Sequence, residues 1–356
     1  MVYGGCVSGQ DFDARLNQIA EPHLFSIAGW EFNAARQEIG QWLSGSEEEL
    51  IENEIRVVTE YFDSVERKPV LALVVEKIIE KQVQDTLTQQ GIFNPITQED
   101  FNFPPVNFRL EELPLLLVIS PRNRIESTRE IVLKQALDTP GKEAIEADAD
   151  ELGISSLVVD IGGIATYPSL VDNRAGLQYT IDTITEEWLH HYLAFTPLGF
   201  RYLLDVAGIS RDYEIASMNE SLAGMISKEI GALVYLKYYS GYENEDVQTP
   251  ESEFDFNSEM REIRKNVDIL LAREEIEQAE EFMEQKRQYL ESKGYYIRKL
   301  NQAYFAFNGT YAHNPAFISP IGLELNELRS RSVSLKDFLD TAAALTSRQD
   351  LTASVR

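Results

Sequence analysis

The segment that decides the fold lies in the middle of the chain and reads EEWLHH, from Glu186 to His191. It holds two of the four histidines of the chain. The apolar spacing around it predicts a helix over residues 182–194. Residues four apart on a helix share a face, so Glu186 and His190 can bind one metal ion. Glu187 is turned about 100° away on the helix and can reach a water molecule beside that ion.

A second segment supplies a further carboxylate. It reads MNESLAG over residues 218–224 and begins a helix predicted over 219–239. Because a following antiparallel helix can return a side chain to the same point, Glu220 suits the place of a third ligand. The sequence therefore predicts three metal ligands: Glu186, His190 and Glu220. It predicts two residues next to these ligands: Asn219 and His191.

Together the two segments resemble the gluzincin, or thermolysin-like, branch of zinc metallopeptidases. That branch carries a His-Glu-x-x-His helix followed by an Asn-Glu-x-x-Ala helix, and residues 219–223, NESLA, match the second motif. The resemblance covers about residues 110–240. It implies zinc as the cofactor, a peptide or protein as the substrate, and Glu187 as the base that deprotonates the attacking water. It also implies a zincin-like small sheet beside the helices that carry the site.

The departure from this family is Glu186, which stands where the first histidine is expected. One imidazole with two carboxylates still holds a divalent ion, but such a site binds zinc less tightly and acidifies the bound water less. Three explanations stay open. The site works with altered ligands, the substitution is engineered, or the chain is an inactive zincin-like scaffold that binds a protein or peptide along its cleft.

Two other metal sites are less consistent with the sequence. A register that pairs Glu187 with His191 puts Trp188 in the place of the base, and indole cannot accept a proton. A carboxylate-bridged di-iron bundle needs a second Glu-x-x-His unit. The remaining two histidines, His23 and His313, have no glutamate three residues earlier.

Hydrolysis through the metal site also needs a donor for the oxyanion that forms on the substrate. The aromatic segment over residues 303–313 contains two candidates for this catalytic role, Tyr304 and His313. The alternative is that its aromatic side chains only fill the core.

Composition excludes several other classes of protein. The 356 residues include 59 acidic and 32 basic side chains, for a net charge of −27. Such a surface repels phosphate, so we expect no binding to nucleic acid or to anionic lipid. A single cysteine excludes an intramolecular disulfide framework. No apolar run approaches the ~18 residues of a transmembrane helix. The chain is expected to be cytoplasmic, or exported with a lipoprotein leader removed before Cys6.

The remaining pattern predicts an α+β fold that is mostly α. Strands are expected over 115–119 and 156–161, with a helix over 125–137 between them and a third extended piece over 164–170. Further helices are predicted on both sides of this region: 11–43, 46–62, 70–87, 256–290, 296–311 and 335–345. The expected division is an N-terminal helical region over 1–105, a core with the metal site over 106–245, and a C-terminal helical region over 246–356.

Overall fold

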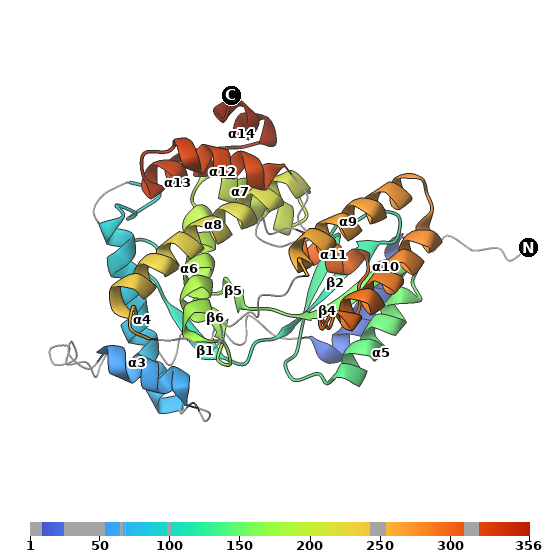
Figure 1. Ribbon diagram of the computed structural model, residues 1–356, viewed down its shortest axis with the longest axis horizontal. Helices are drawn as coiled ribbons and strands as arrows, with labels where there is room; N and C mark the ends of the chain where they lie inside the picture. The colour runs from blue at the N-terminus through green and yellow to red at the C-terminus, as the bar shows by residue number, and fades with distance from the viewer. Residues whose placement is uncertain are drawn as a thin grey trace, which may run out of the picture.

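Two long helices carry the predicted site. The computed structural model describes residues 9–24, 54–64, 67, 69–97, 101–242, 254–309 and 320–356. Helix α6 (Leu177–Leu193) and helix α8 (Tyr213–Tyr238) lie side by side and antiparallel, joined through α7 (Pro197–Val206) (Figure 1). Both predicted site helices are therefore confirmed, and each begins several residues earlier than expected.

Other helices enclose this pair and bury its apolar faces. They are α3 (Glu54–Asp63), α4 (Pro69–Gln89), α12 (Ile321–Arg331), α13 (Leu335–Ala343) and α14 (Arg348–Ser354). The largest hydrophobic cluster joins residues of all of them to α6 and α8, with Trp188 fully buried near its centre. Helix α14 begins at a cap, because the hydroxyl of Ser347 accepts a hydrogen bond from the Asp350 amide.

A small sheet lies beside α6. Its strands are β1 (Phe108–Glu111), β6 (Ser169–Asp172) and β5 (Gly163–Ile164), in the order β1-β6-β5. Strand β6 pairs in parallel with β1 and antiparallel with β5. The extended piece predicted over 164–170 is thus two short strands, and β5 at the end of the sheet contacts α6.

A second sheet has the order β3-β2-β4 and is antiparallel throughout. It contains β2 (Leu115–Pro121), β3 (Arg129–Leu133) and β4 (Ile154–Asp160). Helices α1 (Gly9–Ala20) and α5 (Thr139–Asp150) cover one face, and α11 (Gln302–Asn308) covers the other. A short 3-10 helix, η1 (Glu21–His23), follows α1.

The helix predicted over 125–137 is wrong, because its centre forms strand β3. Ile131 and Leu133 alternate into the core, and the strand pairs with Leu115–Ile119 of β2. Tertiary pairing overrides the helical pattern of the isolated segment.

The long helix predicted over 256–290 is two helices, α9 (Phe256–Ala272) and α10 (Ile276–Ser292). The chain turns between them at Glu274, which has a positive φ of 61°. This turn folds the apolar stripe of α9, with Ile263 and Val267, onto Met283 of α10. The apolar residues of the two helices are therefore buried against each other, which one continuous helix would not allow.

The fold class is α+β, mostly α, as predicted. The division into three regions stays a prediction, and the largest hydrophobic cluster draws on residues from all three. Within the described part of the chain, no helix is long and apolar enough to cross a membrane. Cys6 and His313 lie outside the described residues, as do residues 25–43, 46–53 and 310–311 of the predicted helices.

Candidate metal centre

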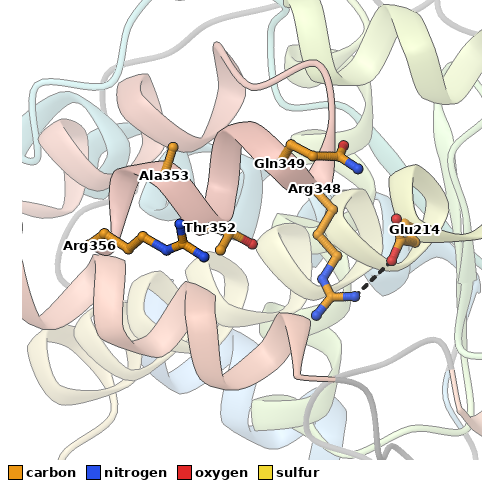
Figure 2. Close-up of a pocket in the computed structure, with 6 residues that line it drawn as sticks. All are labelled: Glu214, Arg348, Gln349, Thr352, Ala353 and Arg356. Carbon is orange, nitrogen blue, oxygen red and sulfur yellow. Dashed lines mark hydrogen bonds and ion pairs between the residues drawn. The ribbon is translucent and has the colours of Figure 1, made fainter.

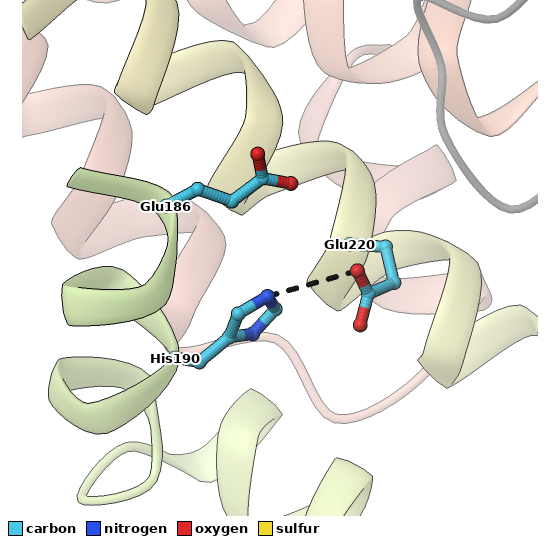
Figure 3. A group of neighbouring side chains, drawn as sticks. All are labelled: Glu186, His190 and Glu220. Carbon is cyan, nitrogen blue, oxygen red and sulfur yellow. Dashed lines mark ion pairs between the residues drawn. The ribbon is translucent and has the colours of Figure 1, made fainter. Parts of the chain in front are cut away.

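The structure brings the three predicted ligands together. Glu186 and His190 lie one turn apart on α6, and Glu220 reaches them from α8 (Figure 3). One ligand atom from each residue lies within 4.8 Å of the other two, and His190 Nε2 is 3.6 Å from Glu220 Oε2. Ligand atoms on a tetrahedral zinc ion are about 3.4 Å apart. The histidine and Glu220 already have this spacing, so the group could hold a metal ion.

The electrostatics of the group also fit a cation. The pKa of Glu186 is raised to about 7: burial is the main cause, the charge of His190 opposes it, and the nearby carboxylate of Glu220 adds to it. Burial likewise raises the pKa of Glu187 to about 8. Burial alone would lower the pKa of His190, but the surrounding carboxylates outweigh it and the net shift is upward. A divalent ion would offset this concentration of negative charge.

Asn219 controls the orientation of the histidine ring. Its amide oxygen lies 3.1 Å from His190 Nδ1, and the residue is fully buried on α8. A proton on Nδ1 can therefore be donated to Asn219, which leaves the lone pair of Nε2 directed at Glu220 and the metal position. The sequence placed Asn219 next to the ligands, and the structure gives it this contact.

Tyr202 on α7 is part of the site and was not identified from the sequence. Its hydroxyl donates to Glu220 Oε1 at 2.6 Å, and its ring stacks on His190 with a centroid distance of 6.1 Å. Burial and the charge of Glu220 raise its pKa well above the usual value, so the hydroxyl stays a donor. The sequence does indicate the helix that carries Tyr202: Thr196 followed by Pro197 is an N-cap and a first-turn proline, which mark the start of α7.

Glu187 lies between the metal group and the edge of the small sheet. Its charge interacts with those of His190, Glu186 and Glu220. On its other side the carboxylate meets Gly163 of β5. Its role as the base for a metal-activated water stays a prediction.

The other predicted site residues lie elsewhere or outside the described residues. The ring of His191 packs against Tyr167, with a centroid distance of 5.8 Å, and the metal group uses Glu186 and His190 instead of the shifted register. Tyr304 packs among residues that cover the β3-β2-β4 sheet, and its described contacts do not reach the metal group. The catalytic roles of Tyr304 and His313 stay predictions.

A hollow at the C-terminal helix is lined mostly by residues of other types than those of the metal group. Its lining residues are Glu214, Arg348, Gln349, Thr352, Ala353 and Arg356 (Figure 2). Arg348 already donates to Glu214 at 2.8 Å. The six lining residues include one carboxylate and no histidine, so this hollow offers no comparable set of ligands.

The fold and the site define an α+β, mainly helical protein with a Glu-His-Glu group, between two antiparallel helices, that could hold a metal ion. Comparison of the chain with protein-family models, curated proteins and solved structures gave no match. The function is therefore argued from the chemistry of the site.

Proposed function

We propose that the chain is a zinc-dependent hydrolase of zincin type that cleaves peptide bonds. The observation that carries this proposal is the convergence of Glu186, His190 and Glu220, with the carboxylate of Glu187 beside them. Three ligands with an adjacent carboxylate are the parts that metal-assisted hydrolysis needs.

Each side chain has a distinct task in this reaction. Glu186, His190 and Glu220 would hold the ion, which would supply polarisation of the scissile carbonyl and acidification of a bound water. Glu187 accepts the proton from the attacking water and returns it to the leaving amine. The Tyr202 hydroxyl holds Glu220 in place through the 2.6 Å hydrogen bond.

A peptide is the favoured substrate because of the strand next to the base. Strand β5 ends its sheet and passes the carboxylate of Glu187 at Gly163. An extended peptide can add to the free edge of a sheet through main-chain hydrogen bonds. Such an addition at β5 would bring a backbone carbonyl close to the metal group.

The test is hydrolysis by the purified chain loaded with zinc. A mixed library of unmodified peptides is incubated with the protein, and the products are identified by mass spectrometry. We expect cleavage that stops with a chelator and in Glu187→Gln but continues in Glu229→Gln, which changes a carboxylate of α8 paired with Arg329. Equal cleavage by the original chain and Glu187→Gln would contradict the proposal.

A second candidate function is an inactive scaffold that binds a peptide without cleaving it. The observation that favours it is Glu186, since a second carboxylate ligand makes the ion a weaker acid towards its bound water. Retention of library peptides by the zinc-loaded chain with no cleavage products would support this candidate over the hydrolase.

A further inference from the structure

Two consecutive glycines lie against one face of α6. That face carries Tyr179, Thr183 and Glu187, which are spaced four residues apart. A Cβ atom on Gly162 would lie 2.0 Å from the Tyr179 hydroxyl oxygen. A Cβ atom on Gly163 would lie 2.4 Å from Glu187 Oε1 and 2.7 Å from Thr183 Cγ2. At Gly162 and Gly163 the chain therefore approaches α6 so closely that no side chain fits between them.

Space, and not backbone conformation, requires glycine at position 163. The positive-φ glycines of the described chain are Gly91, Gly153, Gly208 and Gly294. Gly163 adopts a backbone conformation that other residues also adopt, and it pairs with Val171 in the antiparallel ladder. An alanine at this position is thus free of backbone strain, and the three atoms nearest to its Cβ belong to two side chains of α6.

The consequences of the two conflicts differ. Thr183 is buried and points a methyl group at the strand, so this contact concerns packing. The contact with Glu187 concerns the carboxylate itself, whose oxygen is the nearest atom to position 163. A general base must lie within hydrogen-bond reach of the proton it takes, and a displacement of about 1 Å can cost about 100-fold in rate.

We propose that Gly163 is a positioning residue for Glu187: the bare backbone of β5 sets where the carboxylate lies relative to Glu186, His190 and Glu220. This inference rests on the proposed function. It goes further by assigning to the sheet a part in placing the base. Gly163 belongs to β5 and is not one of the ligands, so its replacement leaves the metal-binding atoms unchanged.

The test compares the original chain with four variants: zinc affinity is measured by calorimetry on the metal-free proteins, and kcat is measured on the zinc-loaded proteins with a peptide that the original chain cleaves. Gly163→Ala is expected to lower kcat by about tenfold to 100-fold while zinc affinity stays within about twofold. Gly241→Ala is the matched control, since a Cβ there meets no atom within 4 Å, and it should leave both quantities unchanged. Glu187→Asp withdraws the carboxylate by one methylene group. Adding Gly163→Ala to Glu187→Asp should therefore change kcat by less than about twofold.

A purely structural role for Gly163 gives a different pattern. If Gly163 has only a structural role, Gly163→Ala should lower kcat by the same factor whether residue 187 is Glu or Asp. That result would overturn the inference, and so would an unchanged kcat in Gly163→Ala. If Gly163→Ala does not fold, the same substitutions are introduced into a Thr183→Ser background, which lacks the methyl group that would contact a Cβ at position 163. Absence of zinc-dependent cleavage by the original chain contradicts the proposed function and this inference with it. Cleavage that depends on Glu187 but not on Gly163 contradicts the inference alone.

Discussion

The amide oxygen of Asn219 lies 3.1 Å from Nδ1 of His190, so the residue that precedes one ligand orients the ring of another. The neighbouring Ser221 is equally buried, and its hydroxyl has no hydrogen-bond partner among the described residues. A comparison of substitutions at Asn219 and Ser221 therefore distinguishes an effect on the orientation of the histidine from an effect of removing a buried polar side chain of α8.

Asn219→Ala should weaken zinc binding by about tenfold to 100-fold, because the ring loses the partner that fixes its tautomer and direction. Calorimetric titration of the metal-free protein measures this change. Ser221→Ala is the control and should bind zinc as the original chain does. An equal loss of affinity in both variants would show that the contact with His190 has no special part.

Glu186→His should increase zinc affinity by roughly tenfold or more, on the scale seen for changes around metal ligands. Imidazole suits zinc better than a second carboxylate, and the substitution removes one negative charge beside Glu187 and Glu220. The variant should also unfold at a higher temperature in the presence of zinc, because the ion binds the native state. Equal or weaker zinc affinity would mean that position 186 does not face the metal.

Tyr202→Phe should lower zinc affinity, because Glu220 loses the hydroxyl donor that holds its carboxylate. A hydrogen bond to a charged group contributes about 1.5–3 kcal/mol, so a loss of about tenfold to 100-fold is expected. Tyr235→Phe is the control, since its hydroxyl donates to the Tyr242 carbonyl at the other end of α8. Unchanged zinc affinity in Tyr202→Phe would remove Tyr202 from the site.

The metal-free protein should become less stable as the pH rises from 5 to 8. Burial raises the pKa of Glu76 to about 7, of Glu186 to about 7 and of Glu187 to about 8. A carboxyl group whose pKa is higher in the native state than in the unfolded state stabilises the native state when it is protonated. This contribution is fully present below the unfolded-state pKa of about 4.3 and is lost as the pH rises through the native-state pKa. Urea unfolding in the presence of a chelator should show a fall of about 2 kcal/mol or more over this range.

Two comparisons check the cause of this pH dependence. Glu187→Gln cannot ionise at that position, so its free energy of unfolding should depend less on pH than that of the original chain. Saturating zinc should oppose the fall at pH 8, because the ligands bind the ion in their deprotonated form. Stability that rises between pH 5 and 8 without metal would contradict the raised pKa values.

The parts of the fold that the sequence predicted are those with a strong local pattern. The apolar run of β2 and the periodic spacing of α6 and α8 each indicate one type of element with few alternatives. The i and i+4 spacing placed Glu186 and His190 on one face before any tertiary contact was known.

The parts that were missed depend on contacts between distant segments. Strand β3 is defined by its pairing with β2, which the pattern over 125–137 does not contain. Tyr202 carries no motif, and only the packing of α7 against α6 and α8 brings it to Glu220. The approach of Gly163 to Glu187 likewise exists only once β5 lies on α6.

The central claim is that Glu186, His190 and Glu220 bind one metal ion, and a zinc titration by calorimetry tests it most directly. The metal-free original chain and Glu229→Gln should each bind one zinc ion per chain with the same affinity. His190→Ala and Glu220→Ala should show no measurable binding at that site. Zinc binding of equal strength and stoichiometry in the original chain and in both alanine variants would contradict the claim.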